Sequence, residues 1–166
     1  MQDTIYFKRK IYNKLLEWKQ NSNGKTALLI EGARRIGKST IVENFAKNEY
    51  EDYILIDFNI APDEIKELFI HERSDIDLLL QKIQTFYRKV LPIRNSLIIF
   101  DEVQFCPEAR SMIKYLVADG RYDYLETGSL ISIKKNVENI LIPSEEEKIH
   151  MYPLDFEEFL WAMGDT

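Results

Sequence analysis

The chain has 166 residues, of which 45% are hydrophobic and 30% are charged, a composition typical of one soluble globular domain and not of a disordered chain. Its single cysteine excludes an intrachain disulfide. Residues 1–50 hold ten Lys/Arg and five Asp/Glu, whereas residues 51–166 hold twelve and twenty-three, and this acidic majority argues against nucleic-acid binding. Without a signal peptide or an apolar run of about twenty residues, we expect a cytoplasmic protein with no membrane contact.

Hydrophobic periodicity predicts helices and strands that alternate along the chain. The predicted helices cover residues 8–20, 38–48, 61–70, 75–89, 107–119 and 155–163. The predicted strands cover residues 26–30, 53–58, 96–100, 122–126 and 148–152. This alternation predicts an α/β fold, in which a parallel sheet lies between helix layers and every strand ends at the same edge. Ligands bind at that edge in such folds, and the motifs described below all fall there.

A complete phosphate-binding loop follows the first predicted strand. Its residues are Gly32, Ala33, Arg34, Arg35, Ile36, Gly37, Lys38 and Ser39. Gly32 and Gly37 allow the backbone to approach a phosphate closely, and the helix that follows offers unpaired N–H groups. We expect Lys38 to reach the β- and γ-phosphates, Ser39 to bind Mg²⁺ and Thr40 to contact the α-phosphate. The motif therefore predicts a nucleotide site.

Two acids, Asp101 and Glu102, end the apolar run at residues 97–100. Acidic side chains at the end of a buried strand indicate a partner or a functional role, because burying a charge is costly. We expect Asp101 to hold Mg²⁺, directly or through water, and Glu102 to polarise an attacking water. A kinase for a small substrate does not need that second acid, so its presence favours hydrolysis over phosphoryl transfer to another acceptor.

Two pairs of residues have more than one interpretation. Arg34 and Arg35 add positive field at the γ-phosphate, contact an effector or a neighbouring molecule, or face solvent from the outer side of the loop. Thr127 and Ser129 follow the fourth predicted strand, where a hydroxyl either senses the γ-phosphate and orients the water, or closes a turn at Gly128. The sensor interpretation is slightly favoured for Thr127.

Four segments resemble a known family, and together they span nearly the whole chain: residues 31–40, 97–104, 126–130 and 151–161. They resemble the N-terminal ATPase domain of a prokaryotic group of AAA-type ATPases related to the STAND branch, in which a C-terminal domain of unknown function follows. The resemblance implies a P-loop NTPase α/β/α sandwich. Its five-stranded, mainly parallel sheet is an AAA-like core with strand order 5-1-4-3-2.

The same resemblance implies the ligands and roles of the site, with ATP and Mg²⁺ bound and Thr127 or Ser129 as the sensor. Because family members continue further, we expect residues 1–166 to be a single core domain that ends before a lid and the C-terminal domain. That missing domain is also the expected route to a protein partner or homo-oligomer. Residues 130–147 contain no arginine to act as a finger. Since such a finger contributes about 10³–10⁵ in rate, we expect slow hydrolysis.

Four functions are compatible with these motifs. The first is an ATPase, which Glu102 beside Asp101 favours. The second is a nucleotide-gated switch that turns over rarely. The third is a small-molecule kinase, which the compact P-loop domain allows. The fourth is a protein-association module with nucleotide as a structural ligand, to which the acidic run at residues 145–147 and the aromatic C-terminal segment could contribute an interface.

Overall fold

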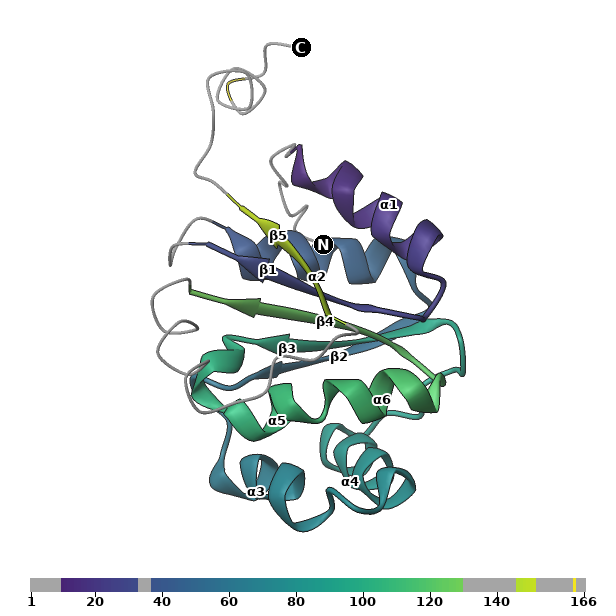
Figure 1. The fold of residues 1–166 in the computed structure, drawn as a ribbon, viewed down its shortest axis with the longest axis vertical. Coiled ribbons are helices and arrows are strands. Elements are labelled where there is room, and N and C mark those ends of the chain that lie inside the picture. Colours follow the sequence, from purple (N-terminus) through teal and green to yellow (C-terminus); the bar gives the residue numbers. More distant parts are fainter. Residues whose placement is uncertain (1–9, 33–36, 130–145, 152–162, 164–166) are drawn as a thin grey trace, which may run out of the picture.

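The computed structural model describes residues 10–32, 37–129, 146–151 and 163, and Figure 1 shows their arrangement. The helices are α1 (Ile11–Ser22), α2 (Lys38–Glu49), α3 (Asp63–His71), α4 (Ile76–Tyr87), the 3₁₀ helix η1 (Val103–Phe105), α5 (Pro107–Ser111) and α6 (Ile113–Asp119). The strands are β1 (Ala27–Glu31), β2 (Asp52–Asp57), β3 (Ser96–Asp101), β4 (Asp123–Gly128) and β5 (Glu146–His150). None of the helices in this described part is long and apolar enough to span a membrane.

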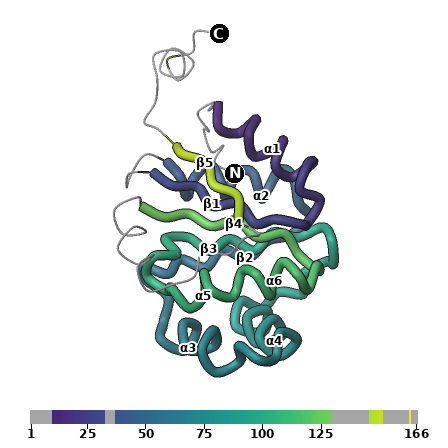
Figure 2. Tube along the Cα trace, in the orientation of Figure 1, coloured from purple at the N-terminus to yellow at the C-terminus, as the bar shows by residue number. Residues whose placement is uncertain are grey.

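The five strands form one sheet in the order β2-β3-β4-β1-β5, and every pair is parallel. Read from its other edge, this is the predicted order 5-1-4-3-2, so the expected AAA-like core is confirmed. The register places Asp57 opposite Asp101 and Glu31 opposite Gly128. The strands therefore end together at one edge, where the N-terminus of α2 also lies (Figures 1 and 2).

Helices cover both faces of the sheet, as predicted. In Figure 1, α1 and α2 lie on one face, and α3 to α6 lie on the other. Alternate residues of a strand point to opposite faces. In β1, Leu28 and Ile30 accordingly join the core under α1 and α2, whereas Ala27 and Leu29 join the core under α3 to α6. Burial on both faces explains why the inner strands read as continuous apolar runs.

The structure corrects the boundaries of several predicted elements. The single helix predicted at 107–119 is two helices that meet at Met112, whose N–H bonds the Ala109 carbonyl in a tighter i−3 turn at 3.1 Å. The Ser111 hydroxyl donates to the Glu108 carbonyl at 2.8 Å, which competes with regular helical bonding there. The first helix ends at Ser22, later than predicted, and the fifth strand begins earlier, at Glu146. Most of the helix predicted at 155–163 lies outside the described residues.

A buried ion pair attaches the edge strand β5 to the α5 side of the sheet. Arg110 donates from Nη2 and Nε to the two carboxylate oxygens of Glu146, at 2.7 and 3.2 Å, and the two side chains are 4% and 0% exposed. Glu126 of β4 is fully buried beside this pair. Burial and the neighbouring Glu146 raise the pKa of Glu126 well above its ordinary value. The raised pKa favours the protonated form of Glu126.

Candidate nucleotide-binding site

The residues on either side of the predicted phosphate loop meet at the junction of β1 and α2. Gly37 precedes α2 with a φ of 94°, a left-handed conformation that favours glycine. The buried Lys38 side chain reaches back toward the end of β1, where its Nζ donates to the Gly32 carbonyl at 3.0 Å. Thr40 is exposed in the first turn of α2. The expectations for Ala33, Arg34, Arg35 and Ile36 lie outside the described residues.

Asp101 is the last residue of β3, and its carboxylate faces the first turn of α2. Ser39 Oγ lies 2.9 Å from each of the two Asp101 carboxylate oxygens. The pKa of Asp101, which is 4% exposed, is raised because burial disfavours its charge. Hydrogen bonds from Thr127 and Ser39 oppose this, while the charges of Asp57 and Glu102 add to it. A bound cation would relieve the cost of ionising this buried carboxyl group.

Thr127 connects the two acids of the site. Thr127 was predicted to follow the fourth strand, but the strand extends to Gly128, so Thr127 lies inside β4. Its buried hydroxyl donates to Asp101 Oδ1 at 2.6 Å and accepts from the Glu102 backbone N–H at 3.0 Å. The Thr127 hydroxyl thus contacts both acidic residues, Asp101 through its carboxylate and Glu102 through its backbone. Ser129 lies beyond the strand and is 9% exposed.

Glu102 begins a tight turn at the end of β3. Its backbone has a φ of 54°, and its carbonyl accepts from the Phe105 N–H at 3.1 Å. Its carboxylate is partly exposed, and one of its oxygens, Oε2, accepts a hydrogen bond from Gln104 Nε2 at 2.6 Å. Gln104 was not among the predicted site residues, although its polar side chain between Val103 and Phe105 was a signal for it.

Asp57 is a second site residue that was not predicted from the sequence. It ends β2 and is in register with Asp101 on the neighbouring strand, and the next N–H along, of Phe58, donates to the Asp101 carbonyl at 2.9 Å. Its negative charge contributes to the raised pKa of Asp101. The signal was available, because residues 53–57 are an apolar run that ends in an acid, the same pattern that identified Asp101.

The donor set of the site suits Mg²⁺. The Ser39 hydroxyl and the Asp101 carboxylate are hard oxygen donors that already touch, and Mg²⁺ is usually held by one or two carboxylates together with substrate phosphates and water. Within the described ranges, no group of three or more His, Cys, Asp or Glu side chains could hold a metal by itself. The site therefore suits a cation that arrives with a phosphate ligand.

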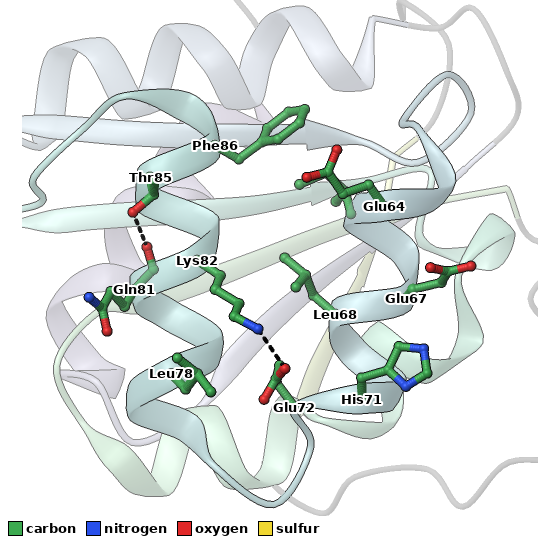
Figure 3. Close-up of a pocket in the computed structure, with 11 residues that line it drawn as sticks. Glu64, Glu67, Leu68, His71, Glu72, Leu78, Gln81, Lys82, Thr85 and Phe86 are labelled. Atoms are coloured by element: carbon green, nitrogen blue, oxygen red, sulfur yellow. Dashed lines mark hydrogen bonds and ion pairs between the residues drawn. The ribbon is translucent and has the colours of Figure 1, made fainter.

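A separate groove of roughly 780 Å³ lies between α3 and α4, on the opposite face of the sheet from α2 (Figures 1 and 3). Lys82 and Glu72 form a 2.7 Å ion pair across it. The other lining residues are Glu64, Ile65, Glu67, Leu68, His71, Leu78, Gln81, Thr85 and Phe86. None of the candidate nucleotide-site residues lines this groove, so it is not positioned to present a phosphoryl acceptor to the P-loop.

The fold and this site define the class of the protein as a P-loop nucleotide-binding α/β domain. The chain belongs to the AAA domain family, whose model matches residues 24–160. That match extends from the turn before β1 beyond β5, and it includes the phosphate loop, both acids and Thr127. A comparison with curated proteins found no match to the chain. Family membership thus agrees with the site geometry on nucleotide binding.

Proposed function

We propose that the chain binds Mg-ATP and hydrolyses it to ADP and phosphate at this edge of the sheet. A continuous set of hydrogen bonds carries the proposal, because it joins Ser39 on α2, Asp101 on β3 and Thr127 on β4. The Thr127 oxygen extends the set to the backbone of Glu102. These contacts support the proposal, because the proposed cation ligands, the proposed general base and the N-terminus of α2 lie together, as phosphate hydrolysis requires. Membership in the AAA domain family supports the same function.

The phosphates bind at the N-terminus of α2 in this proposal. The first N–H groups of a helix lack partners within the helix, and the helix dipole favours negative charge there. Lys38 Nζ, which donates to the Gly32 carbonyl, exchanges that partner for β- and γ-phosphate oxygens. The exchange replaces a neutral acceptor with an anionic one, so it favours the nucleotide-bound state.

Ser39 and Asp101 are the residues that would hold Mg²⁺, and Asp57 adds negative charge beside them. When bound, the ion supplies neutralisation of charge on the phosphate oxygens. The role of the protein is to keep the two oxygen donors in place. Thr127 does this for Asp101 through its 2.6 Å hydrogen bond, so we assign it as a positioning residue for the cation site.

The Glu102 carboxylate is the proposed general base. It accepts a proton from water as the water oxygen attacks the γ-phosphorus, and the bond from that phosphorus to the β–γ bridging oxygen breaks. ADP takes the electron pair of the broken bond. The proton leaves Glu102 for solvent, so the carboxylate is restored for the next turnover.

We propose slow turnover, because residues 130–147 offer no arginine to stabilise charge in the transition state. Slow hydrolysis leaves bound ATP intact for long periods, so a tightly binding slow ATPase can act as a nucleotide-gated switch. No motif identifies the base of the nucleotide, so the preference for ATP rests on the family.

The proposal is tested by two measurements on the same preparation. Calorimetric titration with ATP, GTP and ADP, with and without Mg²⁺, measures affinity, and phosphate release from saturating Mg-ATP measures turnover. We expect ATP to bind more tightly with Mg²⁺ than without it, and phosphate to appear over several turnovers. Tight binding with no turnover would favour the switch. Transfer of phosphate to an added acceptor in preference to water would favour a kinase.

A further inference from the structure

Gln104 is a buried polar side chain with a directed contact to the proposed general base. It lies in the middle of η1 and is 7% exposed. Its Nε2 donates to Oε2 of Glu102 at 2.6 Å. Hydrogen bonds to an ionised acceptor are shorter and stronger than neutral ones, so this contact fixes a carboxylate effectively.

The backbone of Glu102 is fixed by other groups. Its N–H donates to Thr127 Oγ1 at 3.0 Å, and its carbonyl accepts from the Phe105 N–H at 3.1 Å. Its φ of 54° is a left-handed conformation that a residue other than glycine adopts only when its surroundings hold it. The remaining freedom of Glu102 is in its side-chain torsions, and the Gln104 amide restrains these.

We propose that Gln104 is a positioning residue for hydrolysis, which holds one carboxylate oxygen of Glu102 so that the other oxygen receives the proton from the attacking water. This inference rests on the proposed ATPase function. A carboxylate has two oxygens and about four acceptor sites, so one oxygen can accept from the amide while the other meets the water. A general base must lie within hydrogen-bond reach of the proton that it takes.

The restraint matters because proton transfer depends steeply on geometry. A displacement of about 1 Å can reduce a rate by about 100-fold, even when every reacting group is present. Gln104 is neutral and gains or loses no proton in the reaction, so its effect on rate acts entirely through Glu102. Binding of the phosphates is assigned to the loop and to α2, and we expect it to be independent of this amide.

The variants Gln104→Met and Gln104→Glu test this role. Methionine keeps the approximate length and removes the donor, whereas glutamate removes the donor and adds a like charge beside Glu102. We expect kcat for ATP to fall by about 10- to 100-fold in both, with KM unchanged. The matched control is Gln81→Met on the exposed surface of α4, which should leave kcat unchanged. Melting temperatures and circular dichroism separate a rate effect from unfolding.

A double-mutant cycle with Glu102→Gln distinguishes positioning from a purely structural role. Without a carboxylate to position, Gln104→Met should cause no further loss in single-turnover rate beyond that of Glu102→Gln alone. Equal losses in both backgrounds, or an unchanged or faster kcat in the single variant, would overturn the inference. If Gln104→Met does not fold, the kcat of Gln104→Glu decides whether the inference holds. A wild-type chain that releases no phosphate would reject the ATPase and this inference together, whereas active wild type and active Gln104→Met would reject only the inference.

Discussion

The Thr127 hydroxyl donates a 2.6 Å hydrogen bond to Oδ1 of Asp101, which links the interior of β4 to the end of β3. The same oxygen accepts the N–H of Glu102 at 3.0 Å. One side chain therefore contacts both the carboxylate of Asp101, the proposed cation ligand, and the backbone of Glu102, the proposed general base. Removing the Thr127 hydroxyl therefore perturbs the site without changing the phosphate-binding loop.

Thr127→Val removes this hydroxyl and keeps the shape of the side chain. The pKa of Asp101 should rise further, because the hydrogen bond from Thr127 is one of the effects that lower it. A less readily ionised Asp101 holds Mg²⁺ less well, so we expect a higher Mg²⁺ requirement and about 10- to 100-fold slower hydrolysis, the cost of a hydrogen bond to a charged group. Titration of the rate with Mg²⁺ measures both. Thr127→Ser keeps the hydroxyl and should retain most activity; equal losses in both variants would contradict the account.

Lys38→Ala should weaken ATP binding by about 10- to 100-fold or more, because it removes a charge-assisted contact to the phosphates. Calorimetric titration with Mg-ATP gives the affinity directly. Lys25→Ala is the matched control, since it removes an exposed lysine just before β1. An affinity unchanged by Lys38→Ala would remove the lysine from the nucleotide site.

Glu126→Gln should stabilise the protein increasingly as pH rises. Burial raises the pKa of Glu126 above its ordinary value of 4.5, so the folded state binds its proton more tightly than the unfolded state does. The free energy of unfolding of the wild type therefore falls with rising pH above that value, by up to about 1.4 kcal/mol per pH unit from this group. Glutamine does not titrate and lacks this loss. Urea unfolding of both proteins at pH 5 and pH 8 tests this prediction. A smaller gain in the free energy of unfolding of Glu126→Gln over the wild type at pH 8 than at pH 5 would contradict it.

Arg110→Met should destabilise the fold by about 3–5 kcal/mol, because it leaves the buried Glu146 carboxylate without its partner. Urea unfolding measures the loss. The double variant Arg110→Met with Glu146→Gln removes the unpaired charge as well and should recover part of it. Arg121→Met removes the solvent-accessible pairs with Asp77 and Asp119, each of which should contribute about 1 kcal/mol or less. Equal losses from Arg110→Met and Arg121→Met would mean that β5 does not depend on the buried pair.

The parallel α/β class and the site residues that follow a local pattern could be predicted from the sequence, whereas the sheet order came from the resemblance to AAA-type ATPases. Alternating helices and strands limit the topology, and the glycine spacing of the loop and the apolar run before Asp101 are signals within one short segment. The same local rule could have found Asp57, which also ends an apolar run.

The contacts between distant segments could not be predicted. Thr127 meets Asp101 across 26 residues of sequence, and only the register of β4 against β3 brings them together. The Gln104 contact depends on the left-handed turn at Glu102, and no glycine at that position indicates such a turn in the sequence. The break at Met112 likewise arises from Ser111 bonding to the backbone, where apolar periodicity alone predicted one helix.

The central claim is that this site hydrolyses Mg-ATP with Glu102 as the general base. The most direct test is single-turnover phosphate release from Mg-ATP by the wild type and by Glu102→Gln, at matched nucleotide occupancy. We expect the variant to bind Mg-ATP as tightly as the wild type and to release phosphate about 10²–10⁴ times more slowly, the usual contribution of general-base catalysis. Equal rates in the two proteins would contradict the account.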